Sequence, residues 1–519
     1  TPGALLLRAN FVGGPLHLVD GPFGPTAVEV RVDGRPLVPL VGAQPDLSQI
    51  LLAMVDEVRV RRGPAGLRVE LTTLRRRDRR AYSRVEAGSG DPDLESLRLV
   101  FTNGIGGAFA TTAGFELLDS GSPESDLQGF SGGLAWLPGG GTSGLEVQYA
   151  QRSFDLAIED PGTGTRSRLV FGGRLGLTDH LQAGAWIGES RRELDAVLAD
   201  GEGGEDAGGA PPLEDAVTHG GAELRAVWDR GWGNLGARFA DGSALPSREF
   251  EAEAGLTIVP WLAVDGGARL GARDDVDTHE TWAGLAARVS VAGADVRLHG
   301  RWSAGLRGAG WLAADTVPAD TVGFDAVVAG IDVGLGRFVV GGRLRRQRID
   351  RQLSFGTGFD EPAVTWPEAE VISYEAIVDV PVVPLGWLLR GFDPIRARGV
   401  YRHNQIESAA TPLYVPVNAL RGELYFEDAF LEDDLGVRLA LGLDRRDPWL
   451  APPGVAEPGA VAVAVPSRST WNFDVGLRIV GARIFWRYDN VAGRVEQDLP
   501  GFEFPVVRQV FGVRWAFYD

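Results

Sequence analysis

Two glycine-rich segments have spacings that support chemistry in other proteins. Residues 129–133 (GFSGG) match the G-x-S-x-G pattern of a serine nucleophile, which works on a sharp turn between a strand and a helix. Gly139, Gly141 and Gly144 match a dinucleotide-binding loop, which needs a helix N-terminus to hold the phosphates. Here the first segment lies at the start of a strand pattern and the second lies between two strand patterns, with no helix after either. We therefore predict no enzyme activity.

One acidic cluster is a candidate cation site. Asp274, Asp275, Asp277 and Glu280 are close in sequence and provide the oxygen ligands that Ca²⁺ prefers. Because the EF-hand pattern is missing, a solvated acidic loop is the interpretation that we favour. The histidines show no paired spacing, so we expect no transition-metal site and no cofactor. The six histidines are His17, His180, His219, His279, His299 and His403.

Five arginines follow one expected strand toward a long connection. They are Arg343, Arg345, Arg346, Arg348 and Arg351. Guanidinium groups form charge-assisted hydrogen bonds, so an anionic ligand or a lipopolysaccharide phosphate is one partner that they fit. Because the chain has a net charge of −19, we favour pairing with carboxylates of the same protein. The negative charge also leads us to expect no nucleic-acid partner.

The elements that carry these residues are long strands with one apolar and one polar face. Residues 435–444 alternate Leu or Val with Gly, Arg, Ala and Asp, and residues 471–479 and 511–518 do the same. A period of two over nine or more residues is typical of a strand between an apolar and an aqueous medium. On the last strand, Val513 and Trp515 should therefore face lipid while Arg514 faces the lumen.

From about residue 80 onward we expect about 22 such strands, whose connections alternate between short and long. The long ones, among them residues 191–215, 305–321 and 445–470, follow odd-numbered strands, and this requires an even strand number. A sheet in lipid must close because lipid cannot hydrogen-bond a free edge. The sequence therefore predicts an all-β transmembrane barrel in a bacterial outer membrane, with both ends periplasmic and long loops outside. The alternative, a soluble propeller, would show a blade repeat that is missing here.

The first 75 residues have a different organisation. Residues 28–37 predict two short strands joined by a tight turn at Asp33 and Gly34. Residues 47–52 could begin a short helix with Asp46 as its cap, and residues 55–65 and 67–74 continue with strand patterns. We expect a small α+β domain before the barrel.

This N-terminal order resembles the plug domain of TonB-dependent outer-membrane receptors. The similarity lies in residues 28–37, in residues 47–50 (LSQI) and in residues 55–65 (VDEVRVRRGPA), whose Arg62, Gly63 and Pro64 form the most specific match. The resemblance implies a 22-stranded barrel that a plug occludes, with residues 1–78 as a truncated plug-like domain and 79–519 as the barrel. The usual glycine-rich stretch after the Arg-Gly-Pro turn is nearly absent here.

The resemblance also implies a function, the binding or import of a scarce extracellular compound such as a metal chelate, a vitamin or a glycan. The implied partners are outer-membrane lipid and lipopolysaccharide, and a TonB-type energising protein if a TonB box exists upstream. Two alternatives stay open at this point. One is a structural barrel that anchors a surface partner or assembly, and the other is a passive pore with a vestigial plug. An empty barrel of 22 strands would leave an aqueous lumen, so we expect residues 1–74 to lie inside it.

Overall fold

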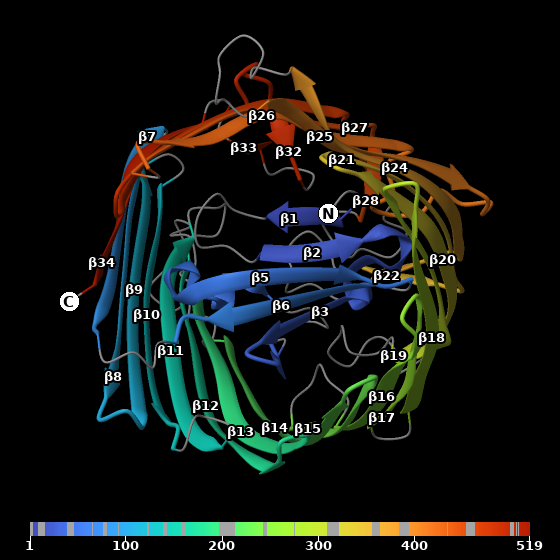
Figure 1. Ribbon diagram of the computed structural model, residues 1–519, viewed down its shortest axis with the longest axis horizontal. Coiled ribbons are helices and arrows are strands. Elements are labelled where there is room, and N and C mark those ends of the chain that lie inside the picture. The colour runs from blue at the N-terminus through green and yellow to red at the C-terminus, as the bar shows by residue number, and fades with distance from the viewer. Residues whose placement is uncertain are drawn as a thin grey trace, which may run out of the picture.

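The structure is a computed structural model that describes residues 4–8, 16–38, 46–64, 66–75, 80–91, 93–121, 124–138, 143–156, 162–196, 213–241, 247–273, 276–308, 321–354, 364–383, 394–432, 434–452, 462–498, 503–504, 506 and 508–518. A closed antiparallel barrel surrounds a small N-terminal domain (Figure 1). No helix in these residues is long and apolar enough to cross a membrane.

The barrel has 22 strands, which confirms the strand number expected from the alternating segments. It closes where β34 pairs with β7, from Tyr518 opposite Tyr82 to Gln509 opposite Asp91. In chain order the barrel strands are β7 (Tyr82–Asp91), β8 (Leu94–Ile105), β9 (Phe109–Gly121), β10 (Glu124–Trp136), β11 (Gly144–Leu156), β12 (Gly162–Thr178), β13 (Leu181–Ala196), β14 (Leu213–Trp228), β15 (Gly231–Asp241), β16 (Arg248–Val259), β17 (Leu262–Arg273), β18 (Val276–Val291), β19 (Ala294–Gly308), β20 (Thr321–Leu335), β21 (Phe338–Ile349), β24 (Ala369–Val383), β25 (Ile395–Ile406), β26 (Asn418–Phe430), β27 (Leu435–Arg446), β30 (Arg468–Ile479), β31 (Ala482–Asp489) and β34 (Arg508–Tyr518).

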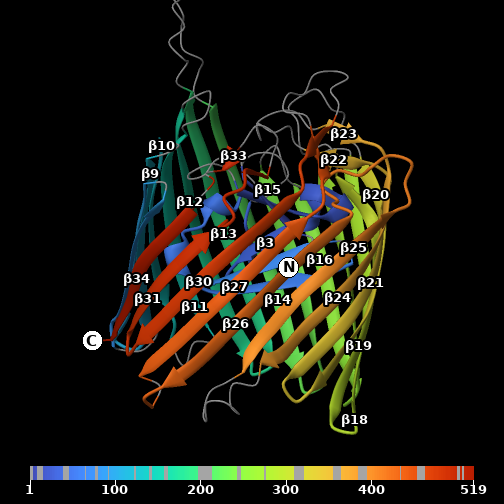
Figure 2. The same ribbon diagram turned by 90° about the horizontal axis from the view of Figure 1, so that it is seen from above.

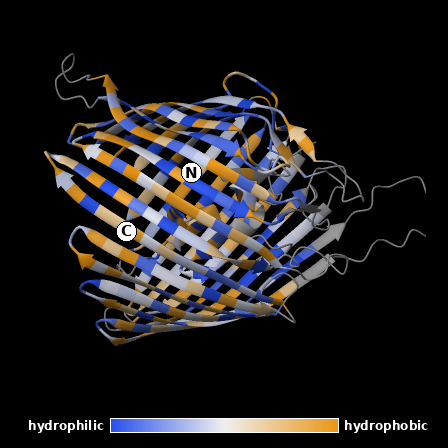
Figure 3. Ribbon diagram, turned by 90° about the vertical axis from the view of Figure 1, so that its right-hand side faces the viewer, coloured by the Kyte–Doolittle hydropathy of each residue, from blue (hydrophilic) through white to orange (hydrophobic). Residues whose placement is uncertain are grey.

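Apolar residues alternate with small and polar ones along these strands (Figure 3). The outward apolar side chains stay exposed although they are large, as a surface that meets lipid requires. On β34, Phe511, Val513 and Trp515 are 57%, 37% and 50% exposed. Between them, Arg514 forms an ion pair with the buried Glu86 of β7. The apolar and charged faces of β34 thus follow the period of two.

The two ends of the barrel differ in the length of their connections (Figure 2). The end that holds Tyr82 and Tyr518 has two-residue turns such as 179–180, 260–261 and 292–293. The long connections expected from the sequence all join strands at the other end. Three of them contain hairpins of their own, β22 (Gln352–Ser354) with β23 (Val364–Trp366), β28 (Trp449–Ala451) with β29 (Val463–Val465), and β32 (Glu496–Gln497) with β33 (Glu503–Phe504).

The N-terminal domain, here called the plug, lies inside the barrel (Figure 1). Its main sheet has the order β4-β3-β6-β5, and β1 pairs with β2 beside it. The plug strands are β1 (Ala4–Arg8), β2 (Leu16–Asp20), β3 (Val28–Val32), β4 (Arg35–Pro36), β5 (Val55–Arg62) and β6 (Leu67–Thr73). The chain passes from β6 to the first barrel strand between Thr73 and Tyr82, while the domain division at residue 78 stays a prediction.

Two local expectations need correction. The helices in the described part of the plug are 3₁₀ turns, η1 (Gly21–Ala27), η2 (Leu47–Gln49) and η3 (Leu52–Met54), so the expected α+β plug contains no α-helix there. Asp46 caps η2 as expected, but the chain is extended again at Ile50 because Leu51 is buried against the wall. Residues 129–133 lie within β10, paired with β9 and β11 on either side, rather than at a strand start.

Candidate functional site

The candidate site is the boundary between the plug and the barrel wall, together with the space left beside it. The turn at Asp33 and Gly34 has positive φ angles of 52° and 84°, as a tight hairpin turn between β3 and β4 requires. Asp33 accepts hydrogen bonds from the backbone N–H and hydroxyl of Thr73 at 2.9 and 2.7 Å. It also accepts bonds from Arg75 at 2.6 Å and from Gln148 of β11 at 3.1 Å. The turn is thereby tied to the wall.

The Arg-Gly-Pro turn packs against the opposite wall, at β21 and β24. Arg62 forms ion pairs with Asp20 of β2 and, at 3.2 Å, with Glu375 of β24. Gln347 of β21 donates a hydrogen bond to the carbonyl of Pro64 at 3.0 Å. Gly63 donates its backbone N–H to the carbonyl of Gly66 at 2.8 Å, which closes the turn.

A buried group of five charged side chains, here called the Asp20 cluster, surrounds this turn. Its members are Asp20, Arg62, Arg345, Glu375 and Arg402, and each side chain is at most 5% exposed. Burial alone would raise the pKa of Asp20, but the guanidinium groups of Arg62, Arg345 and Arg402 lower it to about 2. Asp20 is therefore ionised at neutral pH, and Arg62 pairs with this carboxylate of the plug and with Glu375 of the wall.

A second group, here called the Glu251 cluster, joins the plug to β15, β16 and β17. Its members are Glu29, Arg31 and Arg68 of the plug and Arg238, Glu249, Glu251 and Arg269 of the wall. Arg31 reaches Glu251 at 3.0 Å, and Arg269 reaches Glu29 at 3.1 Å. Burial raises the pKa of Glu29, but the surrounding arginines, led by Arg31, hold it well below its usual range. Here long charged side chains bridge plug and wall, and Val38 of the plug packs against Val217 of β14 and Ala240 of β15.

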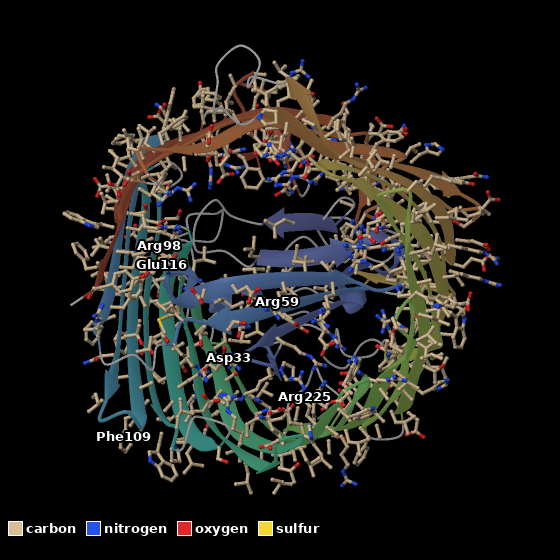
Figure 4. All side chains as sticks on the ribbon, viewed as in Figure 1. Asp33, Arg59, Arg98, Phe109, Glu116 and Arg225 are labelled. Carbon is tan, nitrogen blue, oxygen red and sulfur yellow. The ribbon has the colours of Figure 1, made fainter. Side chains whose placement is uncertain are left out.

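A third group, here called the Glu116 cluster, lies where η2 and η3 meet the wall. Glu116 of β9 accepts from Arg98 and Arg152 at 2.9 Å each, and from the backbone N–H of Leu52 at 3.1 Å. Arg166 of β12 pairs with Asp46 at 3.0 Å. Figure 4 shows Arg98 and Glu116 together beside the plug. An apolar cluster supports this contact, and its members are Leu51, Met54, Leu74, Tyr82 and Val100.

At the end with long connections, parts of these connections fold onto the plug. Gln352 donates to the carbonyl of Pro22 at 2.6 Å and accepts from the backbone N–H of Leu413 at 2.8 Å. Val19 of β2 packs in an apolar cluster with residues of two different connections, Leu413, Tyr414, Trp449, Ala451 and Val465. The plug is thus covered on this side by protein.

The plug leaves a cavity of about 1480 Å³ along the wall from β11 to β19. Plug side chains that line it include Arg59 and Arg68, and wall side chains include Arg225, Glu253 and Arg301. Figure 4 shows Arg59 on the plug and Arg225 on the wall at different sides of the interior. The surface of the cavity is strongly charged, so it holds water rather than an apolar compound.

The remaining candidates from the sequence are distributed as follows. Asp274 and Asp275 lie outside the described residues, and within the described ranges no group of three or more acidic, His or Cys side chains could hold a metal ion. Glu280 faces Arg307 at 3.4 Å. In the arginine run, Arg345 joins the Asp20 cluster and Arg346 pairs with Glu370 at 2.6 Å, as expected for pairing within the protein.

The sequence did not single out the carboxylates that hold the plug. Glu116, Glu251 and Glu375 lie in alternating barrel segments, and Asp20 lies in the plug. The alternation does indicate that the three barrel carboxylates point inward, because each lies on the polar face of its strand. The sequence does not indicate which arginine each carboxylate binds, because partners such as Arg62 and Glu375 are 313 residues apart.

Comparison with known proteins supports the fold. Neither a protein-family model nor a curated protein matches the sequence. Among solved structures, a ferric enterobactin receptor variant (PfeA) from Pseudomonas aeruginosa superposes with a TM-score of 0.73 at 12% identity, over 100% of this chain and 95% of that one. The siderophore receptor PirA from Acinetobacter baumannii gives 0.71 at 12% identity, with 100% and 95% coverage. The FrpB iron transporter from Neisseria meningitidis gives 0.67 at 11% identity, with 99% and 95% coverage. The chain therefore has the plugged-barrel fold of the TonB-dependent outer-membrane receptors.

Proposed function

We propose that this protein is an outer-membrane receptor that imports a scarce extracellular compound, with the plug as its gate. The observation that carries the proposal is the nature of the contact between plug and wall. The plug is attached mainly through arginine–carboxylate groups, the Asp20, Glu251 and Glu116 clusters. Such pairs can exchange their partners for water when the plug shifts, whereas a continuous apolar core between the two parts would hold the plug permanently.

The same architecture supports our proposals for lipid contact and orientation. The exposed apolar side chains of the barrel fit a bilayer, and lipopolysaccharide is the expected neighbour on the outer leaflet. We place the end with short turns, which holds Tyr82 and Tyr518, in the periplasm, and the long connections outside. A TonB-type protein would then act on the plug from the periplasm.

The first ligand class to test is a ferric siderophore. The structural neighbours are named for siderophores, for ferric enterobactin and for iron, and the chain shares their fold at 11–12% identity. Vitamins and glycans form the second set of probes. A calcium ion bound through Asp277 and Glu280 together with the neighbouring aspartates stays a separate, minor proposal.

The test uses a reversible lock, which is simple to design because the chain has no cysteine. A Cβ at Gly129 of β10 would lie 3.2 Å from the Cγ of Leu51, so Leu51→Cys with Gly129→Cys brings two sulfurs within disulfide reach. We expect the disulfide to abolish growth on ferric siderophore as the iron source, and a reductant to restore it. Ligand binding to whole cells should persist in the locked protein.

Single variants, Leu51→Cys and Gly129→Cys, are the controls and should import in both redox conditions. Uptake that is equal with and without the disulfide would contradict a gating plug. Absence of binding to every probe class, in cells that display the folded barrel, would instead favour a barrel that anchors a surface partner.

A further inference from the structure

One arginine on the inner face of the wall has no partner among the described residues. Arg168 of β12 forms no ion pair and no hydrogen bond with any of them, and its Nε atom is buried. Two other arginines of this wall, Arg152 and Arg166, are each paired with a carboxylate. A guanidinium group keeps its charge in proteins, and a buried donor without an acceptor is unfavourable. The surroundings of Arg168 therefore favour an acceptor from outside the chain.

An arginine of the plug reaches the same stretch of β12. A Cβ at Gly172 would lie 2.5 Å from the Nη2 atom of Arg35, so this guanidinium group rests on the wall where a glycine leaves room. Arg168, Gly172 and Arg174 all face the lumen, because alternate residues of a strand share one face. Arg35 and Arg174 line the cavity beside the plug, together with His219 of β14. One arginine of the plug and two of the wall thus flank one edge of the cavity.

The carboxylates at this edge are already bound. Asp33 pairs with Arg75, and Glu146 of β11 forms ion pairs with both Arg35 and Arg75. Figure 4 shows Asp33 at the side of the plug that faces this part of the wall. Burial and the neighbouring positive charges, first that of Arg75 and then that of Arg168, lower the pKa of Arg35 to about 10. Arg35 is still charged at neutral pH, so positive charge is concentrated here although the whole chain carries −19.

One further carboxylate, Glu223 of β14, approaches from the cavity. A Cβ at Gly184 would lie 3.1 Å from its Oε1 atom, and Gly184 is the cross-strand partner of Arg174. Glu223 can offset the charge of Arg174 but not that of Arg168 as well. Three adjoining segments lie outside the described residues, and their sequences hold three arginines and one aspartate in all. They are 39–45 (PLVGAQP), 76–79 (RRDR) and 139–142 (GGGT). The local excess of positive charge therefore belongs to the sequence as well as to the described contacts.

The chemistry of the three guanidinium groups fits an oxyanion of the phosphate class. Guanidinium and phosphate groups form short, charge-assisted hydrogen bonds that are often bidentate. A tetrahedral oxyanion has enough acceptor oxygens for Arg35, Arg168 and Arg174 at once, whereas a carboxylate has only two oxygens. The donors come from both the plug and the wall, so an anion that binds all three would connect the two parts.

We propose that Arg168 and Arg174 of the wall and Arg35 of the plug bind one small oxyanion of the phosphate class, which bridges plug and wall. The site lies between the middle of β12 and its end at the short turn, away from the long connections. Binding requires neither an imported compound nor an energising partner, so it stands or fails separately from the proposed import function.

The experiment measures binding of radiolabelled inorganic phosphate to the purified full chain, by equilibrium dialysis in a phosphate-free detergent with potassium chloride. We expect one equivalent to bind. Arg168→Gln should weaken the affinity at least about tenfold, because a charge-assisted hydrogen bond is lost. The matched control is Arg301→Gln, which removes the same charge from the same cavity but from a pair with Asp265, and it should leave the affinity unchanged.

A second measurement tests the bridge. Because the anion would connect Arg35 to the wall, phosphate should raise the urea concentration at which a protease cleaves the plug. This increase should occur in the parent chain and be absent in Arg168→Gln. Phosphate that binds without raising this urea concentration would overturn the bridge between plug and wall.

Heat-modifiable migration in gels checks that each barrel is folded. If Arg168→Gln fails to fold, Arg174→Gln replaces it, with an expected loss of affinity of roughly threefold because this side chain is exposed. Absence of stoichiometric binding to the folded parent chain overturns the proposal. So does equal weakening by Arg168→Gln and Arg301→Gln, because phosphate would then respond to the charge of the whole cavity. Competition with glycerol phosphate identifies the source: displacement assigns the site to phosphate monoesters such as lipid headgroups, and its absence assigns the site to the free ion.

Discussion

The wall at β21, β24 and β25 and the wall at β15, β16 and β17 hold the same plug in different ways. At the first, the Asp20 cluster is buried and the Arg62–Pro64 turn packs directly on the strands. At the second, side chains of the Glu251 cluster bridge plug and wall beside a cavity of about 1480 Å³. The difference shows that the plug is held by charged clusters of different burial at two parts of the wall, and that it leaves a cavity beside the second.

The largest effect is expected from removing the plug. Deletion of residues 1–74 should raise the single-channel conductance well above that of the intact chain, because an empty 22-stranded barrel encloses a wide aqueous lumen. Planar-bilayer recordings measure the increase, and heat-modifiable migration in gels checks that the barrel is folded. Equal conductance before and after deletion would mean that the plug does not restrict the passage of ions through the lumen. The two wall regions would then not differ in function.

A matched pair of substitutions compares the two regions directly. Glu375→Gln removes the buried carboxylate that holds Arg62 and Arg402, and breaking such a pair costs about 3–5 kcal/mol. Glu253→Gln alters the wall at β16, where the carboxylate is 3.9 Å from Arg68 and partly exposed, and should cost less than about 1 kcal/mol. The free energy of plug undocking, followed by protease cleavage of the plug in increasing urea, reports both. Equal losses of undocking free energy would mean that the two wall regions hold the plug equally strongly.

The smallest effect is expected from pH, which should change the free energy with which the Asp20 cluster holds the plug. In the unfolded chain Asp20 has an ordinary pKa of 3.8, and burial among Arg62, Arg345 and Arg402 lowers its pKa to about 2. Because the folded pKa is the lower one, Asp20 stabilises the docked plug above about pH 4, and this contribution is lost as the pH falls toward 2. Relative to the unfolded chain the loss should be roughly 2 kcal/mol, and for undocking alone it should be smaller, because Arg62 leaves the wall together with Asp20.

The same undocking assay, run from pH 5 to pH 2, measures this change. Asp20→Asn should be less stable at neutral pH and should show a shallower decline across this range. If the variant and the parent chain decline in parallel, Asp20 does not contribute to the pH dependence of the anchor.

The barrel was largely predictable because its rules are local. Alternation with a period of two fixed which residues face lipid, as Val513 and Arg514 illustrate, and the lengths of the connections fixed an even strand number. The turn at Asp33 and Gly34 was also recognisable, because a two-residue hairpin turn with positive φ angles favours this pair. The helix expected after Asp46 was shortened to a 3₁₀ turn, because burial of Leu51 against the wall outweighs the local preference.

The ion pairs that hold the plug could be identified only from the tertiary structure. Arg31 and Glu251 are 220 residues apart, and Arg62 and Glu375 are 313 apart, so no local pattern pairs them. The sequence determined that Glu251 and Glu375 point into the lumen, since each lies on the polar face of a barrel strand. Which arginine meets which carboxylate, and where a gap remains, is decided by how the plug is oriented inside the closed barrel, and that orientation depends on all the anchors at once.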